Sequence, residues 1–283
     1  MPSPTLHDPQ LARLADAHTL TIQHWLSSRA PQARTFTSLG TRVASTGLKI
    51  RLLNQALGAH YPPESPTEDI HADIESVKSF MQARPIPGWY WWLGPFTTPA
   101  HFPELLATHG LDYDGRGLPC MVAPLPAQNY PPLLPNLTVW RAQTLADLQV
   151  ASFIRRTAFG FPDGEALTYF EDMPGDWLDG ASPARLFLAR AGEGEPAAIG
   201  ALILSEGAPG VQVPGVYVMA TLPAWGRRGL GAAILARIMD EATQLGHSFI
   251  VLTASRYGFG LYRKFGFEPL FDYAIFEYSQ ETS

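Results

Sequence analysis

The chain of 283 residues has one cysteine, no long apolar run and no cluster of basic residues. The lone Cys120 excludes an intrachain disulfide and a Cys-x-x-Cys zinc or redox site, and we expect it to be a small buried apolar residue. No apolar run approaches the ~18 residues of a membrane span, and no signal pattern begins the chain, so we expect a cytoplasmic protein without membrane contact. A net charge of −6 without a basic run offers nothing to nucleic acid.

Signatures of several enzyme classes are also missing. The eight histidines lack His-x-x-x-His spacing, so no metal site is predicted, and His18 and His24 are expected to be partly buried or surface residues. No Gly-x-x-x-x-Gly-Lys-Ser/Thr loop and no Gly-x-Ser-x-Gly elbow is present, which argues against a P-loop nucleotide hydrolase and a serine hydrolase. The composition, 46% hydrophobic and 16% charged, is typical of a packed globular protein long enough for two domains.

A glycine-containing turn joins a predicted strand to a predicted helix in the second half of the chain. The strand is Val216 to Ala220, which is rich in residues that favour β-structure. From Leu230 onward, apolar residues recur about every four positions, which predicts an amphipathic helix ending at Gly246. The turn between them reads Thr221-Leu-Pro-Ala-Trp-Gly-Arg-Arg-Gly-Leu-Gly231.

This turn has the features of an anion-binding site. The first N–H groups of a helix have no partner inside the helix, and the helix dipole places positive charge there. Gly229 and Gly231 lack a Cβ, so a phosphate can approach the backbone closely. Arg227 and Arg228 can pair with phosphate oxygens. The other interpretation is an ordinary strand-to-helix turn, and a short Gly-x-Gly alone does not decide between the two.

The turn resembles the acyl-CoA pyrophosphate loop of the GNAT superfamily of N-acetyltransferases, in which Arg/Gln-x-x-Gly-x-Gly/Ala opens the third helix after the fourth strand. Downstream, Ser248 to Thr253 is a predicted strand. The segment from Ala254 to Phe267 resembles the family's fourth helix with its Leu-Tyr-x-x-x-Gly-Phe ending. Loop, strand and helix in this order make a specific signal. Two positions depart from the family pattern: Gly226 replaces the usual Arg or Gln, and Ser255 replaces a common Asn.

The resemblance implies the GNAT fold, a mixed α/β (α+β) architecture with a central sheet flanked by helices, and it implies a site. The backbone at the end of the fourth strand holds the pantetheine and polarises the acyl carbonyl, while the glycine loop holds the pyrophosphate. Tyr262 then donates to the CoA sulfur, although a core-packed tyrosine is the alternative. The residues implied for acetyl-CoA binding are Met219, Ala220, Thr221, Gly226, Arg227, Arg228, Gly229, Leu230, Gly231 and Ser255.

The first half of the chain is predicted to be a divergent GNAT-like domain, which would make two such units in tandem. Its Gly-x-Gly at Gly115 precedes a predicted strand rather than a helix, so we expect no phosphate loop there. The aromatic run from Trp89 to Leu93 is expected to be a core strand. The predicted boundaries are residues 1–127 for this domain, 128–136 for a proline-rich linker and 137–283 for the catalytic domain.

Within the predicted catalytic domain, Thr144 and Asp147 approximate a capping box that opens a helix reaching about Phe159. The activity implied is direct transfer of an acetyl group from acetyl-CoA to a primary amine of a small molecule or peptide. The alternative is a non-catalytic acyl-CoA-binding or regulatory protein, with Ser255 marking decay of the catalytic end. No dedicated base is identified, although an acidic segment from Glu165 to Asp176 falls where the family covers its acceptor. A monomer and a homodimer both remain open.

Overall fold

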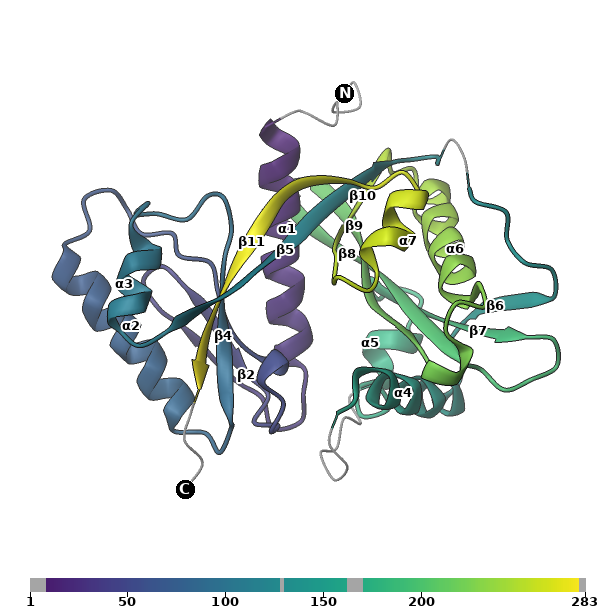
Figure 1. The fold of residues 1–283 in the computed structure, drawn as a ribbon, viewed down its shortest axis with the longest axis horizontal. Helices are drawn as coiled ribbons and strands as arrows, with labels where there is room; N and C mark the ends of the chain where they lie inside the picture. Colours follow the sequence, from purple (N-terminus) through teal and green to yellow (C-terminus); the bar gives the residue numbers. More distant parts are fainter. Residues whose placement is uncertain (1–8, 128–129, 162–169, 280–283) are drawn as a thin grey trace. The chain divides into compact units, whose positions relative to one another are not determined.

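The computed structural model describes residues 9–127, 130–161 and 170–279. The chain forms two compact units (Figure 1). Unit 1 comprises Met1–Thr19 and Pro119–Leu270, and unit 2 comprises Leu20–Leu118 and Phe271–Ser283. The chain passes from one unit to the other inside three elements, which are α1 (Pro9–Ser28), β5 (Asp112–Pro124) and β11 (Glu268–Ser279).

These units do not follow the predicted boundaries of 1–127 and 137–283. β10 pairs with the end of β5, with Thr253 opposite Cys120, so the residues from 119 onward belong to unit 1. β11 pairs with β4, with Ser279 opposite Gly88, so the end of the chain belongs to unit 2. Pairing between strands distant in sequence therefore sets the division. Of the predicted linker 128–136, residues 128 and 129 lie outside the described part.

Unit 1 contains a mixed sheet with the strand order β5-β10-β9-β8-β7-β6. β9 and β10 run parallel, whereas the other neighbours in this order are antiparallel. A parallel pair needs a crossover connection, and here the crossover is a helix. The strands introduced here are β6 (Leu137–Arg141), β7 (Ala184–Ala191), β8 (Ala198–Ala208), β9 (Val211–Thr221) and β10 (Phe249–Thr253).

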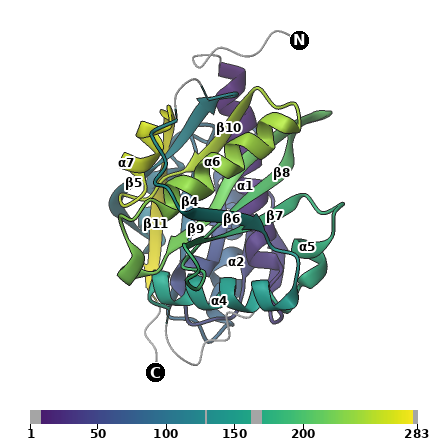
Figure 2. The same ribbon diagram turned by 90° about the vertical axis from the view of Figure 1, so that its right-hand side faces the viewer.

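Helices pack on this sheet. α6 (Leu230–Gln244) is the crossover and packs on β7, β8 and β9, in front of the strands in Figure 2. α4 (Leu145–Phe159) packs on β8 and β9, and the short α5 (Pro174–Leu178) packs on β7. The predicted capping box of α4 is confirmed, since the Asp147 N–H donates to Thr144 Oγ1 at 3.1 Å and the Thr144 N–H donates to the Asp147 carboxylate at 3.0 Å.

The predicted apolar face of α6 is confirmed as far as Ala242. The same spacing assigns Leu245 to this face, which is wrong, because Leu245 is the C-cap residue and is 40% exposed. Leu230, Ile234, Ile238 and Ala242 are buried in one hydrophobic cluster with strand residues of unit 1. Each fully buried aliphatic side chain of the size of leucine contributes about 1.5–3 kcal/mol relative to an exposed one. This packing fixes the helix, and with it the position of its N-terminus at the end of β9.

The last helix is shorter than predicted. The sequence predicts a helix from 254 to 267, whereas α7 spans only Phe259–Lys264. The preceding residues form a turn in which the Gly258 N–H donates to the Ser255 carbonyl at 3.1 Å. Because these residues form a turn, the helix begins only after Gly258.

Unit 2 has the strand order β1-β2-β3-β4-β11, with β3 and β4 parallel and the other neighbours antiparallel. The aromatic run is core as predicted, because Trp89 and Trp91 are fully buried and the Trp91 ring packs edge-on against Phe102. The other elements are β1 (Arg34–Thr37), β2 (Arg42–Ser45), η1 (Arg51–Leu53), β3 (Asn54–Leu57), α2 (Thr67–Gln82), β4 (Gly88–Leu93) and α3 (Phe102–Thr108).

Three further expectations concern single residues and membranes. Cys120 is fully buried, as predicted. The expectation for His18 is wrong, because its side chain is completely buried, whereas His24 is partly buried as expected. Among the described residues, no helix is long and apolar enough to cross a membrane.

Candidate functional site

The pairing of β9 with its parallel neighbour β10 stops before β9 ends. The pairing of β9 with β10 joins Gly215 to Val251 and Val216 to Leu252. Two residues further on, Val218 has a φ of 46°, and the register between β8 and β9 slips opposite this point. This is a β-bulge, which bends the strand that carries it. The described pairs with β10 stop at Val216, so the β9 backbone beyond the bulge is available on that edge.

The glycine turn that follows β9 has the strained backbone of a tight loop. A 3-10 turn, η2 (Pro223–Trp225), comes first, and Arg227 then has a φ of 59°. A non-glycine residue in this left-handed region costs roughly 1–2 kcal/mol. Gly229, with a φ of 80°, is the N-cap residue of α6 and provides no side-chain cap. No capping side chain therefore bonds the first-turn amides of α6, which leaves them available to an anion.

A pocket of about 520 Å³ opens beside this helix start. Its walls come from the end of β9, the glycine turn, the first turn of α6 and α7 with the turn before it. Five of the predicted acetyl-CoA residues line it, namely Thr221, Arg227, Gly229, Leu230 and Gly231. The residues that the structure adds to the lining are Trp225, Ala232, Tyr257, Leu261 and Lys264.

Gly231 lies where α6 approaches its neighbours. A Cβ at this position would lie 3.7 Å from both Leu261 Cδ2 and Thr221 Oγ1, so a methyl group fits but a longer side chain would enter the pocket. Leu261 and Lys264 stand three residues apart on α7 and share one helix face. This spacing is the signal by which Lys264 could have been found in the sequence. Its ammonium adds a second positive charge to the pocket lining, besides that of Arg227.

The two adjacent arginines have different surroundings. Arg227 lines the pocket. The guanidinium of Arg228 lies 4.9 Å from the centre of the Trp225 ring, a cation–π contact that holds it against the loop. The local charge is positive although the chain as a whole carries −6. An anion is therefore attracted to this end of α6 at short range.

Tyr262 and Ser255 lie outside the lining of this pocket. Tyr262 is 8% exposed, and burial raises the pKa of its hydroxyl to about 12, so the phenol is protonated at neutral pH. Gly258 allows this position, because a Cβ there would lie 2.6 Å from the Tyr262 ring. The Ser255 hydroxyl accepts a bond from the Gly258 N–H at 3.3 Å and so supports the turn before α7.

The remaining predicted residues are also outside the lining. The Met219 side chain packs over Gly200 and towards Ile234, Ala220 is buried, and the Gly226 N–H donates to the Pro223 carbonyl at 3.2 Å. The roles expected of these residues involve their backbone groups, and these roles remain predictions. Of the acidic segment, Glu165 lies outside the described residues, and Asp176 stands in the first turn of α5.

Unit 2 repeats the order of a strand, a helix and a parallel strand as β3-α2-β4, but it does not repeat the diverging pair. β3 and β4 stay paired to Leu57 opposite Trp92, and the Gly58 N–H then donates to the Trp92 carbonyl at 2.9 Å. The Trp91 indole N–H donates to the Gly58 carbonyl at 2.8 Å. In unit 2, β3 and β4 thus remain hydrogen-bonded at the position that corresponds to the end of the pairing between β9 and β10 in unit 1.

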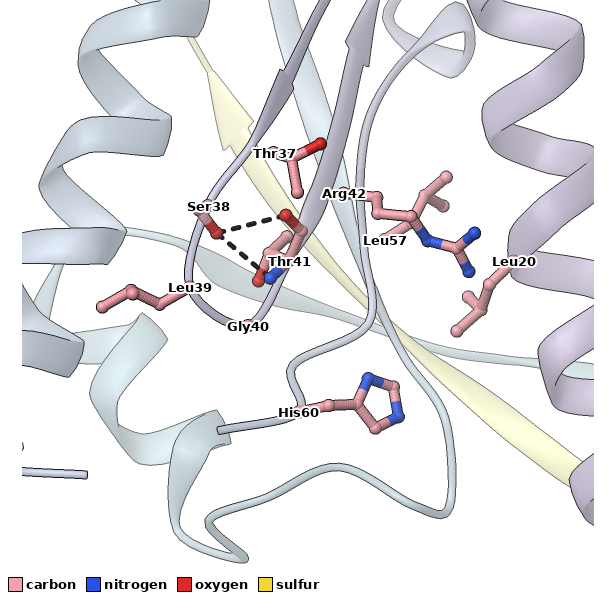
Figure 3. A pocket seen from close by; sticks show the side chains of 9 residues that line it. All are labelled: Leu20, Thr37, Ser38, Leu39, Gly40, Thr41, Arg42, Leu57 and His60. Atoms are coloured by element: carbon pink, nitrogen blue, oxygen red, sulfur yellow. Dashed lines mark hydrogen bonds between the residues drawn. The ribbon is translucent and has the colours of Figure 1, made fainter. Parts of the chain in front are cut away.

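A smaller pocket of about 220 Å³ lies in unit 2 (Figure 3). Its upper wall is the turn between β1 and β2, in which the Ser38 hydroxyl donates to the Thr41 carbonyl and accepts from the Thr41 N–H. No helix N-terminus belongs to its lining. The residues that line it are Leu20, Thr37, Ser38, Leu39, Gly40, Thr41, Arg42, Leu57 and His60. Gly115 lies within β5, away from any helix start.

The mixed sheet, the single diverging parallel pair and the glycine turn at the crossover helix together define the GNAT fold in unit 1. Residues 140–270 match the family model described as an acetyltransferase (GNAT) domain. That part of the chain is a GNAT domain. No curated protein sequence matches the chain.

Solved structures extend the likeness in fold to nearly the whole chain. A GCN5-related N-acetyltransferase from Kribbella flavida has a TM-score of 0.64 at 18% identity, covering 92% of this chain and 94% of its own. A tandem GNAT protein from the clavulanic acid biosynthesis pathway has a TM-score of 0.59 at 13% identity, covering 98% and 97%. A GCN5-related N-acetyltransferase from Sphaerobacter thermophilus has a TM-score of 0.59 at 16% identity, covering 85% and 81%. The chain thus has the fold of tandem GNAT proteins.

Proposed function

We propose that the protein is an N-acetyltransferase that moves an acetyl group from acetyl-CoA to a primary amine of a small molecule or peptide. The observation that carries this proposal is the pocket of about 520 Å³ at the uncapped start of α6, directly after the bulged end of β9. Only unit 1 has this combination among the described residues, so we assign the reaction to unit 1.

Binding of the donor follows from the charges and amides of the pocket. The pyrophosphate lies against the first-turn amides of α6, with Arg227 and Lys264 supplying positive charge. The pantetheine arm runs along β9, where the backbone from Met219 to Thr221 is free of pairing with β10 among the described residues. The same backbone N–H groups polarise the thioester carbonyl, as an oxyanion hole does.

The chemistry is a direct attack. The amine nitrogen forms a bond to the acetyl carbonyl carbon, the C–S bond breaks, and the electron pair leaves on the CoA sulfur. Tyr262 donates a hydrogen bond to the sulfur as charge develops, since its hydroxyl, whose pKa burial raises to about 12, is protonated at neutral pH. The attacking nitrogen carries a positive charge once it has bonded to the carbonyl carbon, and it loses a proton to water as the neutral amide forms. Orientation of the two substrates supplies much of the rate enhancement, so a dedicated base is not required.

Calorimetric titration of acetyl-CoA into three full-length proteins tests the donor site. The unaltered chain is expected to bind with micromolar affinity, and Gly231→Glu is expected to bind at least tenfold more weakly, because its carboxylate enters the pocket beside the phosphates. Gly180→Glu is the matched control, since a Cβ at Gly180 meets nothing within 4 Å, and it should bind normally. No binding by the unaltered chain would contradict the proposal.

Turnover is measured separately by thiol release across a panel of primary amines. Release that depends on both acetyl-CoA and an amine supports the enzyme. Binding of acetyl-CoA without release with any amine would favour the non-catalytic acyl-CoA-binding alternative.

A further inference from the structure

The first half of α1 is built into unit 1 through a completely buried histidine. Leu11, Ala15 and His18 lie on one face of the helix, and all three side chains are fully buried. His18 Nδ1 lies 2.6 Å from Ser205 Oγ on β8. This polar contact between a buried imidazole and a half-buried hydroxyl fixes the orientation of the ring.

The ring of His18 fits into a notch that glycine creates in β9. A Cβ at Gly215 would overlap His18 Nε2 and would lie 2.6 Å from Cε2 of Tyr217. The rings of His18 and Tyr217 have centroids 5.7 Å apart. Among the described residues, His18 Nε2 has no hydrogen-bond partner. The imidazole is thus wedged between the backbone of Gly215 and the ring of Tyr217.

This wedge acts at the point where β9 leaves β10. Gly215 and Val216 are the last described residues of β9 that pair with β10, Tyr217 follows, and Val218 is the bulge. A ring that contacts both Gly215 and Tyr217 therefore spans the last paired residue. Interiors pack too closely for such a contact to move without moving the strand.

We infer that His18 is a positioning residue for the acyl transfer, which holds β9 in the course that presents the backbone from Met219 to Thr221 to the thioester. This inference rests on the proposed function. His18 does not act as a base, because burial lowers its pKa to about 3 and its ring reaches no substrate pocket that the structure describes. His18 affects the reaction only through the position of β9.

Hydrogen–deuterium exchange of the full chain, with and without acetyl-CoA, tests this role without knowledge of the acceptor. In the unaltered chain, acetyl-CoA is expected to slow exchange at least fivefold in two segments, 217–222 and 229–233. In His18→Ala, protection of 229–233 should persist because the glycine turn is intact, whereas protection of 217–222 should fall to less than twofold. Ser205→Ala keeps the His18 ring but removes the hydrogen bond that orients it. This variant should show an intermediate loss of protection at 217–222.

The outcomes separate the two proposals. Protection of both segments in His18→Ala would overturn the positioning role alone. Absence of protection at both segments in the unaltered chain would remove the proposed function, and this inference with it. A purely structural role would lower the protection of both segments together, which would also overturn the inference.

A pair of substitutions keeps the test decisive if His18→Ala unfolds. In a chain that keeps His18, Gly215→Ala should disrupt segment 217–222, because the new methyl group overlaps the imidazole. In the His18→Ala, Gly215→Ala double variant the overlap with the imidazole is gone. The Tyr217 ring, whose Cε2 would lie 2.6 Å from the new Cβ, can then shift into the space that His18 leaves, so the chain should fold and regain part of the protection at 217–222. Equal damage by Gly215→Ala in both backgrounds would show that the contact with His18 does not matter.

Discussion

At the residue scale, Tyr262 shows how a motif and its surroundings combine. The motif indicates the phenol, and burial raises the pKa of its hydroxyl to about 12, so this hydroxyl is protonated at neutral pH and can donate a hydrogen bond. Gly258 supplies the space, since any side chain there would collide with the ring. The ring also packs edge-on against Phe267 at 5.9 Å, so its direction is fixed by the core. Catalytic and packing roles are thus compatible in one side chain.

Tyr262→Phe is expected to lower kcat about 100-fold, in the lower range for loss of an acid catalyst, and to leave the Kd for acetyl-CoA within twofold. The ring packing is retained, so the fold is not the cause. Steady-state rates and calorimetry give the two quantities. Tyr278→Phe is the matched control, because its hydroxyl bonds Gln82 in unit 2 at 2.7 Å. Equal activity of Tyr262→Phe and the unaltered chain would contradict the role.

At the element scale, α1 is attached to unit 1 by apolar packing and by one neutral imidazole. Gly207 and Gly215 both allow a close approach, because a Cβ at Gly207 would lie 2.8 Å from the Leu14 carbonyl oxygen and one at Gly215 would overlap His18. Burial of His18 in this contact makes its neutral form obligatory. The attachment of the helix therefore depends on pH.

Unfolding by denaturant between pH 7.5 and pH 5 measures this dependence. His18 has a pKa of about 3 when folded against 6.5 ordinarily, so its contribution to stability is complete above pH 6.5 and is lost as pH falls towards 3. The loss is about 1.4 kcal/mol per pH unit below 6.5. His18→Asn should remove this slope while the slopes from His24 and His247, whose pKa values are also lowered by burial, remain in both proteins. Parallel pH curves for the two proteins would exclude His18 as the source.

At the scale of the whole molecule, the two units are interleaved along the chain. Unit 1 takes residues 1–19 and 119–270, and unit 2 takes the rest. Unit 1 therefore extends beyond the predicted range of residues 137–283 at one end and stops short of it at the other. β10 has β5 as its neighbour on the side away from β9, so a fragment without β5 leaves a buried strand with unpaired backbone groups.

A fragment of residues 137–283 is accordingly expected not to fold by itself. It lacks the end of β5 that pairs with β10, and it lacks the first half of α1 with His18. Thermal unfolding followed by circular dichroism should show no cooperative transition for the fragment and a clear one for the full chain. A cooperative transition in the fragment, together with binding of acetyl-CoA, would show instead that residues 137–283 form an independent domain.

The features that depend on near neighbours could be predicted from the sequence. The apolar face of α6, the capping box at Thr144, the core aromatics of β4 and the place of the glycine turn are each encoded within a few residues, so their periodicity or chemistry is visible. The GNAT fold followed from motifs of the same local kind.

The contacts between distant segments could not be predicted from the sequence and became visible in the folded chain. The pairing of β5 with β10, the addition of β11 to β4, the complete burial of His18 and the entry of Tyr257 and Lys264 into the pocket all join residues far apart in the chain or across a turn. The residues of a strand indicate that it will pair, but they do not indicate its partner, because the backbone hydrogen bonds are the same whichever strand it pairs with. The choice depends on how side chains pack across the whole sheet, and no local pattern contains that information.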